Sequence, residues 1–142
     1  MKGQEKGDSM AGAFQTSRDI FENPIWQNIV EFRLFFLLYG KACFEDGVKV
    51  GDTILKRGQY LRSFRNLRED LAYIENRAIK YYSLSSIHRA AQNLVNDNRI
   101  IFETTELGTL FTVVNYDKYQ CLENYKLNLE RRENAERTQR EQ

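Results

Sequence analysis

The segment GTLFTVVNYDKYQ (residues 108–120) begins with a turn glycine, continues as a β-rich stretch and ends in two tyrosines three residues apart. β-Branched and aromatic residues predominate after Gly108, which is typical of a strand. The preceding segment 100–105 has the same character, and the residues Glu106, Leu107 and Gly108 separate the two. Together they predict a β-hairpin, because a short glycine-containing turn joins two strand-forming segments.

Tyr116 and Tyr119 follow this hairpin at positions i and i+3. Side chains at this spacing lie on one side of a single helical turn. We expect both rings to pack on the first helix of the domain while their hydroxyl groups stay near water. Packing is a more common role for such a pair than stacking on nucleic-acid bases.

The first helix is predicted to run from about Pro24 to Cys43, with Asn23 as its N-terminal cap. Its C-terminal half is apolar on nearly all sides, so we expect that half at the centre of the domain. The turn-rich connection 44–52 follows, and 53–64 is predicted to be a short strand.

Two further helices are predicted between this strand and the hairpin. In the segment 65–82, apolar residues recur at the spacing of an amphipathic helix, and these are Leu67, Leu71, Ile74 and Ala78. The segment 83–98 predicts the second helix of the pair, with Ile87, Ala91 and Leu94 on its buried side.

A strand, two helices and a β-hairpin follow one another in the order of a winged helix-turn-helix. The predicted fold is therefore α+β and mainly helical, with a C-terminal β-hairpin wing and a charged C-terminal tail. We expect the domain to span 14–120. Residues 1–13 are predicted to be a disordered N-terminal tail, and 121–142 a charged helical or disordered tail or linker.

The outer side of the 83–98 helix carries Ser, Arg, Gln and Asn, the residue types that contact base edges and phosphates in a major groove. The chain has a net charge of only +1, but the segment 56–99 holds nine Lys and Arg residues against four Asp and Glu. Such a local excess suits a polyanion, although an ordinary solvated face is the simpler interpretation of charge alone. We expect duplex DNA to be bound through the 83–98 helix and the hairpin wing. The residues predicted to contact DNA are Ser85, Ser86, His88, Arg89, Gln92, Asn93 and Asn96 on the helix, and Arg57, Arg62 and Arg65 before it.

Other classes of protein are disfavoured by the composition. One histidine and two distant cysteines, Cys43 and Cys121, suit neither a metal site nor a nucleophilic pair. There is no P-loop motif, so we expect no enzyme and no cofactor. The cysteines are interpreted as unpaired thiols of a reducing cytoplasm. No apolar run is long enough to span a bilayer, so no membrane contact is expected.

Four segments resemble the N-terminal winged-helix region of phage replisome organisers, which are DnaD-like replication initiators. They are IFENPIW (20–26), KRGQYLRSFRNL (56–67), SLSSIHRAAQNLV (83–95) and, most specifically, GTLFTVVNYDKYQ (108–120). The resemblance implies a cytoplasmic module that binds double-stranded DNA, self-associates and acts when replication starts. Such proteins usually carry a further C-terminal domain for helicase or loader contacts. The residues after Gln120 look like the start of a linker, so the resemblance implies the DNA-binding module more directly than helicase loading.

Two alternatives to a replication module stay open at this point. One is a phage or plasmid transcriptional regulator with the same DNA-binding fold. The other is a winged-helix module that serves protein assembly alone, with an incidental basic segment. The polar side of the 83–98 helix favours a DNA-binding module over the second alternative.

Overall fold

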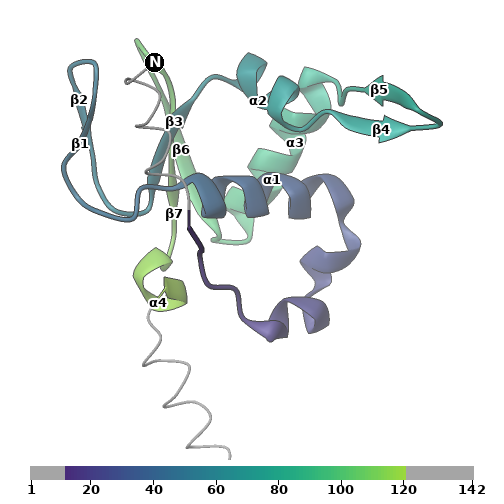
Figure 1. Cartoon of the computed structure of the whole chain (residues 1–142), viewed down its shortest axis with the longest axis horizontal. Helices are drawn as coiled ribbons and strands as arrows, with labels where there is room; N and C mark the ends of the chain where they lie inside the picture. The colour runs from purple at the N-terminus through teal and green to yellow at the C-terminus, as the bar shows by residue number, and fades with distance from the viewer. Residues whose placement is uncertain (1–11, 121–142) are drawn as a thin grey trace, which may run out of the picture.

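The computed structural model describes residues 12–120, which form a mixed α+β domain (Figure 1). Nearly all of the predicted tails at 1–13 and 121–142 therefore lies outside the described residues. The α-helices in this range are α1 (Ile29–Lys41), α2 (Phe64–Asp70), α3 (Leu84–Asn96) and α4 (Tyr116–Gln120). The strands in this range are β1 (Val48–Val50), β2 (Thr53–Leu55), β3 (Gln59–Arg62), β4 (Tyr73–Glu75), β5 (Ala78–Lys80), β6 (Ile100–Thr105) and β7 (Gly108–Val113).

The first helix begins later than the sequence predicted. Two 3-10 turns precede α1, namely η2 (Arg18–Glu22) and η3 (Pro24–Gln27). The Asn23 side chain does cap a helix, because its Oδ1 accepts a hydrogen bond of 3.0 Å from the Ile25 N–H. Asn28 then adopts an extended conformation, so the α-helix starts only at the next residue, and it ends at Lys41 rather than Cys43.

The segment predicted as one strand, 53–64, forms two strands that belong to different sheets. β2 pairs with β1 in a hairpin, whereas β3 pairs with β7. The connecting turn contains Gly58, whose φ of +88° is favourable only for glycine. A Cβ atom there would lie 2.9 Å from the Cβ atom of Tyr116, so the turn needs glycine for space as well.

The helix predicted over 65–82 is wrong beyond Asp70. Its first turns form α2 and bury Leu67, but the chain then forms the β4–β5 hairpin, which projects from the domain (Figure 1). Ile74 and Ala78 are exposed instead of buried, and Ile74 retains 75% of its accessible surface. The β-branched and aromatic residues of this segment favour strands, and that preference prevailed over the helical spacing.

The tip of the β4–β5 hairpin contains two non-glycine residues in the left-handed region. Asn76 and Arg77 have φ values of +52° and +66°, as the two central residues of a tight hairpin turn require. We expect Arg77→Gly to raise the free energy of unfolding by about 0.5–1 kcal/mol, because glycine adopts this conformation without a Cβ clash. Urea denaturation measures the change. Ala78→Gly, in the extended strand beside it, is the control and should not stabilise; a loss of stability in Arg77→Gly would contradict the turn geometry.

The β6–β7 hairpin predicted from the sequence is confirmed, with Thr105 opposite Gly108 at its tip. Together with β3 it forms an antiparallel sheet of strand order β3-β7-β6. Phe111 of β7 is fully buried between this sheet and the helices.

The predicted packing of Tyr116 on the first helix is also confirmed, because its ring centroid lies 5.9 Å from that of Tyr39 in α1. The side chain of Tyr119 lies outside the described structure.

Candidate nucleic-acid interface

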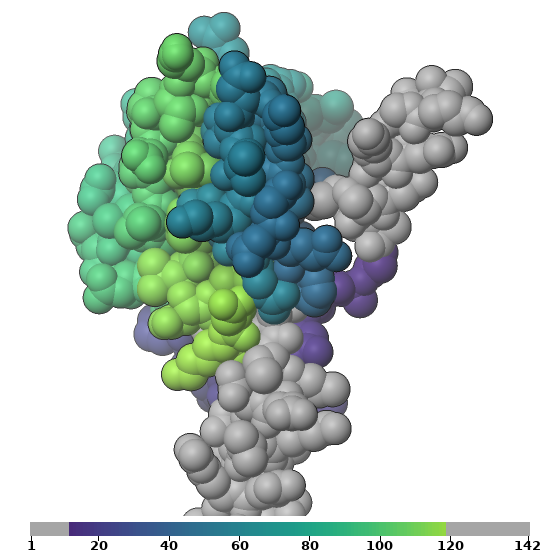
Figure 2. All heavy atoms as spheres, turned by 90° about the vertical axis from the view of Figure 1, so that its left-hand side faces the viewer, coloured from purple at the N-terminus to yellow at the C-terminus, as the bar shows by residue number. Residues whose placement is uncertain are grey.

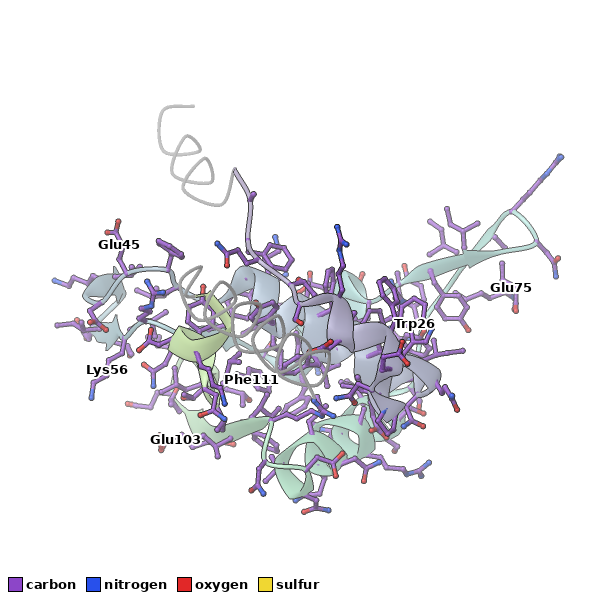
Figure 3. All side chains as sticks on the ribbon, turned by 90° about the horizontal axis from the view of Figure 1, so that it is seen from below. Trp26, Glu45, Lys56, Glu75, Glu103 and Phe111 are labelled. Atoms are coloured by element: carbon purple, nitrogen blue, oxygen red, sulfur yellow. The ribbon has the colours of Figure 1, made fainter. Side chains whose placement is uncertain are left out.

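Helix α3 separates buried and exposed residues as the sequence predicted. Ser83 caps it by accepting a hydrogen bond of 3.1 Å from the Ser86 N–H, and Ile87, Ala91 and Leu94 are fully buried. Side chains of α3 point away from the domain along its lower edge in Figure 3. The exposed residues of this helix include Ser85, His88, Arg89, Gln92 and Asn96.

The exposed polar side chains of α3 have few competing contacts. Gln92 donates a hydrogen bond of 3.3 Å to Asn96 at the surface, which orders two amides side by side. Arg89 has no hydrogen bond or ion pair to any residue between 12 and 120. The guanidinium group of Arg89 is therefore available for a ligand. His88 stacks on Phe64 with the ring centroids 3.9 Å apart, so one face of the imidazole is covered.

Two of the predicted contact residues on α3 have structural contacts instead. The half-buried Asn93 donates a hydrogen bond of 2.8 Å to Glu31 and thereby fixes α3 against α1. The half-buried Ser86 accepts a hydrogen bond of 3.0 Å from the hydroxyl of Ser83 in the helix cap. Both residues line a shallow groove of about 240 Å³ between α3 and the start of α1, and Arg89 lies at the same groove.

The three predicted arginines outside α3 are not brought together. Arg62 donates two hydrogen bonds, of 2.7 and 2.8 Å, to the carboxylate of Asp70, and this pairing raises the pKa of Arg62. Arg57 pairs with Asp117 of α4 and donates a hydrogen bond of 2.8 Å to the Phe44 carbonyl, so its guanidinium group connects α4 with the loop after α1. Lys56, next to it, lies at the opposite end of the molecule from the β4–β5 hairpin (Figure 3).

Only Arg65 of these three arginines is exposed and without a bonded partner among the described residues. It is the second residue of α2, next to Phe64, whose ring stacks on His88 of α3. Arg65 therefore belongs to the same region of the surface as the start of α3. Arg57 and Arg62 serve the fold in this structure.

Two positioning residues, Arg33 and Arg68, were missed from the sequence. Arg33 of α1 donates a hydrogen bond of 2.7 Å to the Leu71 carbonyl. Arg68 of α2 donates one of 3.1 Å to the Tyr82 carbonyl, directly before α3. These bonds fix the two ends of the β4–β5 hairpin and orient the start of α3. No local sequence signal marks them, because each partner is a backbone carbonyl at a distant position.

The β6–β7 hairpin, predicted as a DNA-contacting wing, has an acidic surface. Its residues 100–113 include Glu103 and Glu106 but no Lys or Arg. The β1–β2 hairpin lies beside it (Figure 2), with Gly51 so near Leu107 that a Cβ atom would come within 3.0 Å of that side chain. An acidic hairpin is a poor partner for phosphate groups, so the cationic residues of the candidate interface are those of α2, α3 and the β4–β5 hairpin between them.

Comparisons with protein-family models, with curated proteins and with solved structures found no match. Within residues 12–120, none of the helices has the length and apolar character needed to cross a membrane. The same part of the chain contains no cluster of His, Cys, Asp or Glu able to hold a metal ion. Cys43 is a half-buried free thiol whose pKa is raised by burial, and Cys121 lies outside the described residues.

Proposed function

We propose that the chain is a DNA-binding module of the winged helix-turn-helix class that places α3 in the major groove of duplex DNA. The observation that carries this proposal is the exposed face of α3, where Arg89, Gln92 and Asn96 make no hydrogen bond or ion pair with any other element among the described residues. Arg and amide side chains are those that form paired hydrogen bonds with guanine and adenine in the major groove. Strand order β3-β7-β6 behind α2 and α3 supports the fold class.

The distribution of unpaired charge supports contact through α2, α3 and the segment between them rather than through the β6–β7 hairpin. Four cationic residues in or between α2 and α3 have no acidic partner among the described residues, and they are Arg65, Arg77, Lys80 and Arg89. When a helix lies in the major groove, phosphate groups of the DNA backbone border it on both sides. Cations on that helix and on the segment before it can therefore bind these phosphates. The acidic β6–β7 hairpin would face away from the DNA backbone in this arrangement.

The proposed biological role is the start of replication in the manner of phage replisome organisers, in the cytoplasm. This role is supported by the resemblance of 108–120 and three other segments to that family. Transcriptional regulation would use the same face of α3. A protein-assembly module is the second candidate, and it is favoured by Ile74 and Ile79, which pair across the β4–β5 hairpin and are 75% and 64% exposed.

The experiment that tests the proposal compares duplex and single-stranded DNA of the same sequence in titrations of the full chain at low salt. A helix that reads a major groove requires a duplex, so the duplex should bind more tightly than either single strand. Absence of duplex binding at low salt would remove the DNA-binding proposal and leave the assembly module. Equal affinity for both forms would contradict the placement of α3 in a groove.

A further inference from the structure

The β4–β5 hairpin projects from the domain directly before α3. It extends past the helices in Figure 1, and Figure 3 shows Glu75 on its outer part, away from the remainder of the domain. Every residue from 74 to 81 is exposed. None of residues 73–80 belongs to the buried core of the described domain. The side chains of the hairpin are therefore available for contacts outside the domain.

The base of this hairpin is held in a fixed direction relative to α3. Tyr73 of β4 stacks on Tyr82, with the ring centroids 4.8 Å apart, and Tyr82 lies two residues before α3. Arg33 donates a hydrogen bond of 3.3 Å to the hydroxyl group of Tyr82, besides its bond to the Leu71 carbonyl. Arg68 binds the Tyr82 carbonyl from α2. An arm that is already ordered loses little conformational entropy when it binds a ligand.

The tip of the hairpin carries a cation that the turn itself does not require. Arg77 has a φ of +66°, a conformation that glycine adopts at lower cost. Its side chain has no hydrogen bond or ion pair to any residue between 12 and 120, and the same is true of Lys80. A residue that is held in an unfavourable backbone conformation, with an unused charge, points to a role in binding.

Two exposed isoleucines lie on one face of the hairpin behind this tip. Ile74 and Ile79 are directly opposite each other in the two strands and are 75% and 64% exposed. Proteins that bind the minor groove of DNA combine the same two kinds of side chain. Arginine reads the minor-groove edges and the groove width, while apolar side chains contact the base steps. The unpaired charge at the tip favours DNA over an apolar protein surface as the partner of this pair.

The dimensions of the hairpin allow its tip, but not the whole ribbon, to enter a minor groove. The five residues from Ala72 to Asn76 extend about 16 Å at a rise of about 3.3 Å per residue. This length exceeds the major-groove width of about 12 Å, so the hairpin can pass the phosphate strand next to α3. Two strands lie about 4.8 Å apart before their side chains are counted. A minor groove about 6 Å wide therefore admits only the side chain at the tip.

We propose that the guanidinium group of Arg77 enters the minor groove next to the major groove that α3 occupies, with the Ile74–Ile79 pair at the edge of that groove. This inference rests on the proposed function of α3 and adds a second contact to it. In the minor groove, a G·C pair presents the 2-amino group of guanine, whereas an A·T pair presents acceptors alone. A guanidinium group can only donate hydrogen bonds. Arg77 should therefore prefer base pairs that lack this amino group.

Two duplexes that differ only in the minor groove test this contact, one of alternating G·C pairs and one of alternating inosine·C pairs. The base of inosine is guanine without its 2-amino group, so both duplexes present the same groups to α3 in the major groove. We expect the full chain to bind the inosine duplex at least about fivefold more tightly, at the lower end of the range for a base contact. Arg77→Gly should bind both duplexes equally, and it keeps the turn because glycine suits the left-handed conformation. The control Lys49→Ala should retain the preference.

The outcomes separate this inference from the proposed function of α3. Equal binding of both duplexes by the unmodified chain would overturn the minor-groove contact and leave the role of α3 intact, whereas binding of neither would overturn both. A preference that persists in Arg77→Gly would assign the reading of the amino group to another residue and also overturn the inference. Ile74→Ser/Ile79→Ser should weaken binding of the inosine duplex and leave sedimentation of the DNA-free chain unchanged. Slower sedimentation of this variant would show that the isoleucines join two copies of the chain instead.

Discussion

Replacing Phe111 with alanine should lower the free energy of unfolding by about 3–5 kcal/mol, the range for a fully buried phenylalanine. Phe111 is 0% exposed and lies on the central strand of the β3-β7-β6 sheet. Its ring centroid is 5.6 Å from that of Phe64 and 5.7 Å from that of Phe102. The substitution therefore leaves a cavity at the point where the sheet meets α2.

Urea denaturation of the full chain measures this loss, and Ile101→Ala in the neighbouring strand is the control. Ile101 is 56% exposed, so its truncation removes little buried surface and should cost far less. A domain with total stability of about 5–15 kcal/mol would be strongly weakened by the Phe111 change. A loss below about 1 kcal/mol would show that Phe111 is not at the centre of the core.

Duplex affinity should fall about 150-fold between 50 and 200 mM salt, since about four neutralised phosphates give a log–log slope of roughly −3.6. The estimate rests on the four cations of the α2–α3 region that have no acidic partner among the described residues. Arg57 and Arg62 are left out, because Asp117 and Asp70 already neutralise them.

Fluorescence anisotropy with a labelled duplex across a salt series measures this slope. Lys49→Ala is a suitable control, because Lys49 lies on the β1–β2 hairpin, apart from α3 (Figure 1). Its loss should leave both the affinity and the slope unchanged. A slope near zero in the unmodified chain would show that phosphates contribute little, and a slope near −9 would require many more cations than this surface offers.

The elements that were predicted correctly have signals within a few neighbouring residues. Helix α3 combines a serine cap with apolar residues at helical spacing, and Ile87, Ala91 and Leu94 are indeed buried. The β6–β7 hairpin has a glycine at its turn and strand-forming residues on both sides. In both elements, local preference and tertiary packing favour the same structure.

Elements that depend on strained turns or distant partners were predicted wrongly. The β4–β5 hairpin places Arg77 in a conformation that usually requires glycine, so the sequence has no glycine to indicate the turn. Leu67 and Leu71 also satisfied the helical spacing, which extended the predicted helix past its real end.

The exposure and pairing of the proposed contact residues were predicted only in part for a similar reason. Exposure of Arg89 and Gln92 follows from the position of each on α3, which sequence spacing determines. The pairing of Arg57 with Asp117 and of Asn93 with Glu31 joins residues that are far apart in the chain. Such contacts depend on the tertiary fold, so composition alone overestimated the number of free cations.

The most direct test of the proposed interface is the affinity of Arg89→Ala and Gln92→Ala for a duplex, measured beside Lys49→Ala in the full chain. Both α3 residues are exposed, so neither change should alter stability by more than a few tenths of a kcal/mol. We expect at least one of them to weaken binding by about 1–3 kcal/mol, the value of a base contact, while Lys49→Ala binds like the unmodified chain. If Arg89 contacts phosphate instead, its loss should weaken all duplexes alike and reduce the salt slope by about one. Unchanged affinity in both folded α3 variants would contradict the account and show that this helix does not face DNA.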